Sequence, residues 1–158
     1  MQIATHDLQT KELICQVFID SIHHYFEEVT GEESKVALPY IVDNDEDLLD
    51  DVAAMIGISG SRKGFVYFTG PDALFKELLE FILHDTNPTD EDVADMAADI
   101  ANTVSGNVRR SFGADFMISV PAILSGNSKH IKLPGLEPIY TIPIKWRQHK
   151  SHVVIGLK

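Results

Sequence analysis

A carboxylate and an amide lie one helical turn apart in the second half of the chain. In a helix predicted for residues 89–112, Asp99 and Asn102 are about 60° apart around the axis, so their side chains can reach one target together. Three other residues fall on the same face of this helix: Asp95, Gly106 and Arg109. This arrangement indicates a face that docks against a partner.

The residue types on this face are poor choices for helix stability. Asp, Asn and Gly each cost from several tenths to about 1 kcal/mol relative to Ala inside a helix. A helix selected for stability alone would carry Glu, Lys or Ala at these positions. Gly106 also lacks the side chain that would keep the backbone of a partner at a distance. A solvated face with tolerable residues would have the same spacing, so both interpretations stay open on this pattern alone.

Strong start and stop signals define the helix that carries this face. Thr89 follows Pro88 and can cap the helix, and three acidic residues in the first turn complement its dipole. Gly113 suits the end of the helix. Five apolar residues form the expected buried stripe on the opposite side: Val93, Ala97, Ile100, Val104 and Val108.

The remaining segments predict further helices and several strands. Apolar spacing predicts a helix over 11–29, where either Tyr25 or Phe26 points inward, and Pro71-Asp72 opens a shorter helix to about residue 84. A strand is expected over 35–42, with Pro39 at an edge or a bulge. The other expected strands are 52–59, 64–69, 115–120, 124–133, 138–147 and 151–157. The predicted class is α+β, with long amphipathic helices packed on an antiparallel sheet.

A faint internal repeat suggests how these elements are organised. A shift of 82 positions places Gly31 on Gly113 and Pro39 on Pro121, and brings the apolar phases of the two long helices into register. We therefore expect a single domain over 1–158 with a weak pseudo-twofold repeat, about 11–70 and 89–158.

Charge and composition exclude several classes of function. The formal net charge of −11, from 13 basic and 24 acidic residues, argues against nucleic-acid binding, which needs clustered Lys and Arg. Cys15 is the only cysteine, which excludes an intramolecular disulfide and a cysteine-based metal cage. No apolar run approaches the roughly 18 residues of a membrane helix, and no signal peptide is visible, so a cytoplasmic protein without membrane insertion is expected.

A metal-dependent hydrolase is the main enzymatic alternative that single residues suggest. His23 and His24 are each followed four residues later by a glutamate, at Glu27 and Glu28, and such pairs can bind a metal. A zinc site needs a third convergent ligand and supporting contacts, and none is identifiable. A glycine-rich phosphate loop and a G-x-S-x-G nucleophile motif are also missing from the sequence. We therefore expect no metal and no cofactor bound by this chain.

Several stretches resemble one family of bacterial signalling proteins. Residues 95–107 resemble the signature helix of the CheC–CheX–FliY chemotaxis phosphatases, whose motif is an acid, two residues and then Asn. Residues 118–126 look like the proline-containing strand that follows this helix in the family. Further similar segments are 56–60, 64–66 and 142–144. The repeat places Val17 and Asp20 opposite Asp99 and Asn102, so only one helix carries the motif, as in the CheX branch. That branch implies a homodimer.

The resemblance implies a phosphatase that acts on the aspartyl phosphate of a CheY-like response regulator. Asn102 would orient a water for in-line attack, and Asp99 would pair with the lysine beside the phosphoryl group. Mg²⁺ is expected in the receiver domain of the partner. Asp95, Gly106 and Arg109 would contact that partner. The family usually has Glu at the position of Asp99, and the shorter Asp reduces the reach of this carboxylate. The alternative is a non-catalytic module of the same fold that binds a response regulator or a flagellar switch component.

Overall fold

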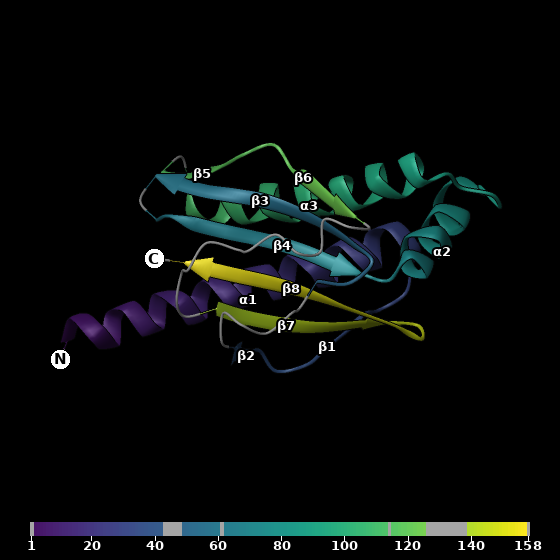
Figure 1. The fold of residues 1–158 in the computed structure, drawn as a ribbon. Coiled ribbons are helices and arrows are strands. Elements are labelled where there is room, and N and C mark those ends of the chain that lie inside the picture. The colour runs from purple at the N-terminus through teal and green to yellow at the C-terminus, as the bar shows by residue number, and fades with distance from the viewer. Residues whose placement is uncertain (1, 43–48, 61, 114, 126–138, 158) are drawn as a thin grey trace.

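One antiparallel sheet with helices on one of its faces makes up the fold (Figure 1). The structure, a computed structural model, describes residues 2–42, 49–60, 62–113, 115–125 and 139–157. The helices in these ranges are α1 (Gln2–Thr30), α2 (Asp72–Leu83) and α3 (Asp90–Phe112). The strands are β1 (Lys35–Val36), β2 (Tyr40–Val42), β3 (Val52–Gly60), β4 (Gly64–Gly70), β5 (Phe116–Ile118), β6 (Ala122–Ser125), β7 (Ile139–Trp146) and β8 (His149–Leu157).

Two long hairpins form the centre of the sheet. The main strand order is β1-β7-β8-β4-β3-β5, with β2 also paired to β7 and β6 also paired to β3. All of these pairs are antiparallel. The short strands lie at the two edges, where they leave few unpaired backbone groups. The α+β class predicted from the sequence is therefore confirmed.

Most expected elements form close to their predicted limits, and three differ. The helix expected over 11–29 begins nine residues earlier, at Gln2. The strand expected over 35–42 is divided into β1 and β2, which both pair with β7, and the Ala37 N–H still donates to the carbonyl oxygen of Pro143 at 3.0 Å. Four positions from Val36 to Tyr40 oppose three from Ile144 to Thr141, so one extra residue forms a bulge at Pro39, as the sequence allowed. The strand expected over 124–133 appears as β6, and residues 126–133 lie outside the described residues. The described elements do not test the proposed repeat.

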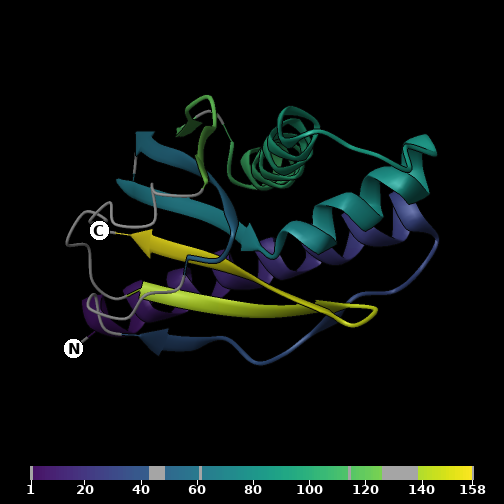
Figure 2. The same ribbon diagram turned by 45° about the vertical axis from the view of Figure 1, so that its right-hand side comes forward.

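The core lies between the sheet and the helices, which share one side of the sheet in two views (Figures 1 and 2). Alternate residues of the central strands, such as Ala54, Ile56 and Phe68, face the helices and are buried. Helices α1 and α3 lie next to each other, and the buried hydroxyl of Ser21 donates a hydrogen bond to the carbonyl oxygen of Val104 at 3.2 Å. This contact fixes how α3 sits on its neighbour.

An arginine in the turn between β7 and β8 ties three elements together. The Arg147 guanidinium forms ion pairs with Glu32, after α1, at 2.9 Å and with Glu77, on α2, at 2.7 Å. It also lies over the rings of Trp146, at 4.7 Å, and Phe81, at 5.2 Å. Arg147 thereby holds α2 against the end of the sheet.

Candidate functional site

Helix α3 begins with a complete capping box. The backbone N–H of Asp92 donates to Thr89 Oγ1 at 3.1 Å, and the Asp92 carboxylate accepts from the backbone N–H of Thr89 at 2.9 Å. These hydrogen bonds hold the pKa of Asp92 below its usual range. The cap predicted at Thr89 is confirmed, and it fixes which residues of α3 face the core.

The five residues of the predicted apolar stripe are all buried, each with less than 5% of its surface exposed: Val93, Ala97, Ile100, Val104 and Val108. Met96, Ala101 and Ser105 widen this buried side. Because the helix is held on this side, the opposite side must face solvent.

The residues predicted for chemistry lie on that solvent side. Asp95, Asp99, Asn102 and Arg109 are exposed, and Gly106 is half-buried. A Cβ atom added at Gly106 would meet nothing within 4 Å, so internal packing does not require glycine there. Asp99 and Asn102 are thus presented together from a fixed helix, with open space one turn beyond them.

A tyrosine from α1 completes the surroundings of Asp99. The Tyr25 hydroxyl donates to Asp99 Oδ2 at 3.4 Å, although the Tyr25 side chain itself is only 3% exposed. Burial, followed by the charge of Asp99 and this hydrogen bond, raises the pKa of Tyr25 far above its usual value. Tyr25 therefore stays protonated and acts as a donor to one of the two carboxylate oxygens of Asp99.

The sequence left open whether Tyr25 or Phe26 points inward, and the structure buries both. The sequence alone did not indicate the contact with Asp99, because the two residues are 74 positions apart. A polar aromatic residue on an otherwise apolar helical stripe was the available signal, since a buried tyrosine hydroxyl needs a partner.

Charges are divided along the solvent side of α3. Its N-terminal half carries Asp95 and Asp99, and its last turn carries Arg109 and Arg110. A shallow hollow of about 550 Å³ lies at the basic end, lined by Gly106, Arg109, Arg110, Gly113 and Ile118. Asn102 lies between the two halves in the helix sequence, so a partner over this amide meets both signs of charge.

The described part of the chain gives little support for a metal site at the histidines or for a cysteine nucleophile. His24 pairs with Glu28 at 3.1 Å, and His23 lies 3.4 Å from the hydroxyl of Ser34. No group of three or more His, Cys, Asp or Glu side chains among the described residues is placed to hold a metal ion. Burial, with a smaller effect of Glu12, raises the pKa of the Cys15 thiol to about 11, which disfavours a thiolate nucleophile.

A family model described as "Chemotaxis phosphatase CheX" matches residues 52–145, which is more than half of the chain. The chain belongs to the CheX family. The matched region of this CheX-family chain contains all of α3 and therefore all five predicted site residues. Helix α1, with Tyr25, lies outside it. No curated protein sequence matches the chain.

Solved structures agree with this assignment. Chemotaxis protein CheX from Vibrio vulnificus is 25% identical over 92% of this CheX-family chain and 99% of its own, with a TM-score of 0.80. The CheX–CheY–BeF₃–Mg²⁺ complex from Borrelia burgdorferi matches at 18% identity over 91% of this chain and 97% of that chain, with a TM-score of 0.74. The middle domain of FliM from Vibrio alginolyticus matches at 15% identity over 93% of both chains, with a TM-score of 0.65. The last two likenesses concern the fold alone.

Two residues of helix α1 in this CheX-family chain are those that the proposed repeat aligns with Asp99 and Asn102. Val17 is half-buried, and Asp20 is exposed and accepts a hydrogen bond from Gln16 at 2.9 Å. A valine and an aspartate therefore stand where the motif would have an acid and an asparagine. Within the described residues, no helix is long and apolar enough to cross a membrane.

Proposed function

We propose that this chain removes the phosphoryl group from the aspartyl phosphate of a CheY-like receiver domain. The observation that carries the proposal is the joint exposure of Asp99 and Asn102 on the solvent side of a capped and buried helix. Membership in the CheX family supports it. A CheX structure from Borrelia burgdorferi in complex with CheY supports the class of partner.

In this proposal Asn102 orients the attacking water and does not itself attack phosphorus. Its amide enters the phosphorylation pocket of the receiver and holds a water in line with the bond between phosphorus and the aspartyl oxygen. The water oxygen attacks phosphorus, the bond to the aspartyl oxygen breaks, and the products are the free carboxylate and inorganic phosphate. Phosphoryl transfer asks a protein mainly for orientation and charge stabilisation, so a neutral amide is sufficient.

The Asp99 carboxylate has a different role from the Asn102 amide. We propose that it pairs with the lysine beside the phosphoryl group and so sets the register of docking. Asp95, Gly106 and Arg109 contact the receiver around this pair. The chain itself holds no cofactor, and Mg²⁺ belongs to the receiver. We also propose that the protein works in the cytoplasm as a homodimer.

The rival function is a binding module that recognises a receiver or a flagellar switch component without hydrolysis. The shared fold with the FliM middle domain and the short side chain of Asp99 favour keeping this alternative. The test is the decay of phosphorylated receiver domains from the same genome, with and without this protein. Faster decay of one receiver supports the phosphatase, and tight binding of every cognate receiver without faster decay would refute it.

Replacing Gly106 with alanine separates stability from docking. We expect Gly106→Ala to raise the free energy of unfolding by about 0.5–1 kcal/mol, because alanine is the better helix former and its Cβ meets no neighbour. The same methyl group should raise the KM for the phosphorylated receiver several-fold. Urea unfolding and decay kinetics measure the two effects. An unchanged KM would remove Gly106 from the docking face.

The Tyr25 hydroxyl should act through Asp99. We expect Tyr25→Phe to raise KM by about threefold, with kcat unchanged, since the carboxylate loses the donor that restricts it. In an Asp99→Ala background the same substitution should have no further effect. Tyr67→Phe is the control, because Tyr67 is a buried tyrosine in the smaller cluster on the other face of the sheet. An equal rise in KM in both backgrounds would show that Tyr25 does not act through Asp99.

A further inference from the structure

A groove between the three helices begins at Asp99 and leads away from Asn102 toward the end of α2. Its volume is about 300 Å³. That is the share of liquid volume taken by about ten waters, enough for one large side chain or two small ones. Because Asp99 is part of the groove wall, a receiver domain that contacts Asp99 meets the edge of the groove.

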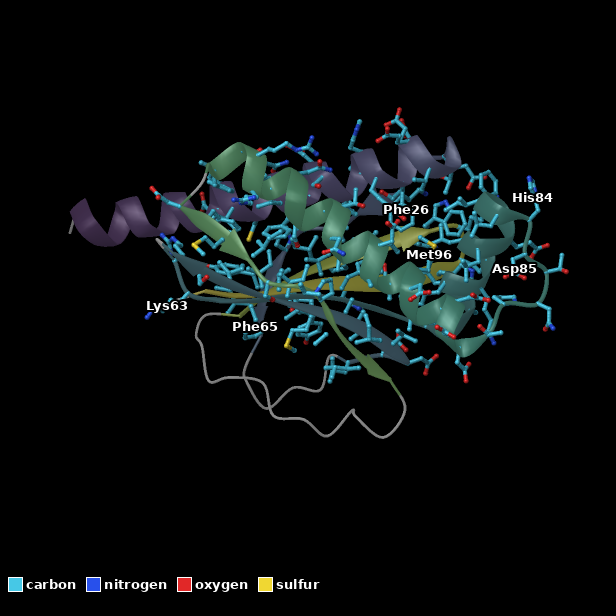
Figure 3. All side chains as sticks on the ribbon, turned by 90° about the horizontal axis from the view of Figure 1, so that it is seen from above. Phe26, Lys63, Phe65, His84, Asp85 and Met96 are labelled. Carbon is cyan, nitrogen blue, oxygen red and sulfur yellow. The ribbon has the colours of Figure 1, made fainter. Side chains whose placement is uncertain are left out.

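The floor of the groove is apolar. It is formed by Val29 of α1, by Leu79, Ile82 and Leu83 of α2, and by Met96 of α3. Leu79 and Met96 are buried, but Leu83 is 65% exposed. Figure 3 shows Met96 on α3, and Asp85 just beyond α2, at the same end of the molecule. An exposed leucine beside buried apolar residues indicates a binding surface, because covering it with a partner removes apolar area from water.

The rim of the groove is acidic. All charged residues that line it are carboxylates: Asp85, Asp92, Asp95 and Asp99. Asp92 already caps α3, and Asp85 and Asp92 lie close enough to interact. Among the residues that the structure describes, no lysine or arginine belongs to this lining. The surface therefore attracts a group that is apolar in its body and positive at its end, such as a lysine or arginine side chain next to an aliphatic one.

The groove is held in shape by contacts that lie outside it. Helix α2 ends at Leu83 and is capped by His84, whose backbone has a φ of 56° and whose N–H donates to the carbonyl oxygen of Leu79. Glu77, on the same helix, is fixed by the Arg147 ion pair at 2.7 Å. Leu83 and Asp85 are therefore presented from a fixed helix end, so docking there costs little ordering of this chain.

We propose that this groove binds a basic, amphipathic segment of the receiver domain and thereby helps to select which receiver is dephosphorylated. The proposal rests on the proposed function, because it takes the receiver to be the partner of α3. A second copy of this chain is a poorer occupant of the groove. A groove-to-groove contact would bring two sets of four carboxylates together, and like charges oppose such a contact.

The test is binding of a receiver domain held in its activated form by beryllium fluoride and Mg²⁺, measured by isothermal titration calorimetry. The receiver used is the one from the same genome that binds this chain most tightly. We expect Leu83→Ser to raise Kd about tenfold, as for the loss of one leucine-sized apolar contact. Asp85→Asn should raise Kd about threefold and weaken the dependence of Kd on salt, as for the loss of a charge at the rim of an interface.

Matched controls lie away from the groove. Leu38→Ser removes a leucine that is 88% exposed between β1 and β2, and Glu12→Gln removes an exposed charge on α1, more than three turns before Tyr25. Both should bind like the unmodified protein. Because Leu83 and Asp85 do not touch the reacting atoms, kcat at saturating receiver should stay unchanged in Leu83→Ser and Asp85→Asn.

The outcomes separate this proposal from the proposed function. If Leu83→Ser and Asp85→Asn bind the receiver as tightly as the unmodified protein, the groove is not a docking site, whether or not phosphatase activity is present. If sedimentation shows that these substitutions dissociate a dimer and leave receiver affinity unchanged, the occupant is a second copy and the proposal is wrong. If receiver binding depends on the groove but decay is never accelerated, the groove is confirmed as a docking site and the proposed phosphatase function is refuted.

Discussion

Asn102→Ala should lower the rate of assisted dephosphorylation by at least about 100-fold, the cost expected when a reacting water loses its orientation. The substitution should raise the free energy of unfolding by several tenths of a kcal/mol, because the Asn102 side chain is exposed and alanine is the better helix former. Decay of phosphorylated receiver measures the first quantity. Urea unfolding followed by the fluorescence of Trp146, the only tryptophan, measures the second.

A second amide on the same helix provides the control. Asn107 lies about 140° around the axis from Asn102 and pairs with Arg110 rather than pointing to the same target. Asn107→Ala therefore removes the same chemical group and should keep at least about half of the activity, as for a surface position without a special role. If Asn102→Ala keeps a similar share of activity, Asn102 does not orient the water.

Receiver binding in the same variant distinguishes chemistry from docking. Asn102→Ala should bind the activated receiver nearly as well as the original protein, since the Asp99 carboxylate sets the register of docking. A loss of binding equal to the loss of rate would mean that Asn102 acts as a contact residue. The rival binding module would then explain the site better than the phosphatase does.

Local signals in the sequence were enough to place α3 and its exposed face. The Thr89 cap, the acidic first turn and the stop at Gly113 each depend on residues within one turn of the helix end. The buried stripe depends only on helical period. Because both signals agree, the exposure of Asp99 and Asn102 followed from the sequence before any tertiary contact was known.

Contacts between residues that are far apart in the sequence could not be predicted from the sequence. Tyr25 meets Asp99 across 74 positions, and Arg147 meets Glu32 across 115. No spacing rule links such residues, since their meeting depends on how α1, α2 and the β7–β8 turn are arranged around the sheet. The groove beside Asp99 is a product of the same arrangement and was therefore not predicted.

The division of the strand over 35–42 was only half predicted, for a physical reason. Pro39 signalled an edge or a bulge, because proline cannot donate to the ladder. Whether the strand bends or separates depends on its partner. Val36 pairs with Ile144 of β7, the Ala37 N–H still donates to Pro143, and the regular ladder resumes at Tyr40, opposite Thr141. The register of the partner strand is a long-range property that residues 35–42 do not contain.

Phe26→Ala should cause the largest loss of stability among the substitutions considered, about 3–5 kcal/mol. Phe26 is fully buried, stacks on Trp146 with ring centroids 5.9 Å apart, and meets the edge of Tyr25 at 5.7 Å. Its removal leaves a cavity where α1 packs against β7. A domain is commonly stable by about 5–15 kcal/mol, so this loss is a large part of the total. Urea unfolding followed by circular dichroism measures it.

The control for Phe26→Ala is Phe81→Ala, which truncates a phenylalanine that is 39% exposed and covers one side of Arg147. Its cost should stay below about 1.5 kcal/mol, because an exposed ring loses little burial and its cation–π contact is weak. Equal costs for the two substitutions would contradict the packing described for α1. Helix α1 does not carry the motif of an acid, two residues and Asn at the positions that the proposed repeat aligns with Asp99 and Asn102, so its contribution to the site is to hold other residues in place. Through Phe26 it anchors to the sheet, and through Tyr25 it restricts Asp99, so a loosened α1 should also raise KM before it unfolds the protein.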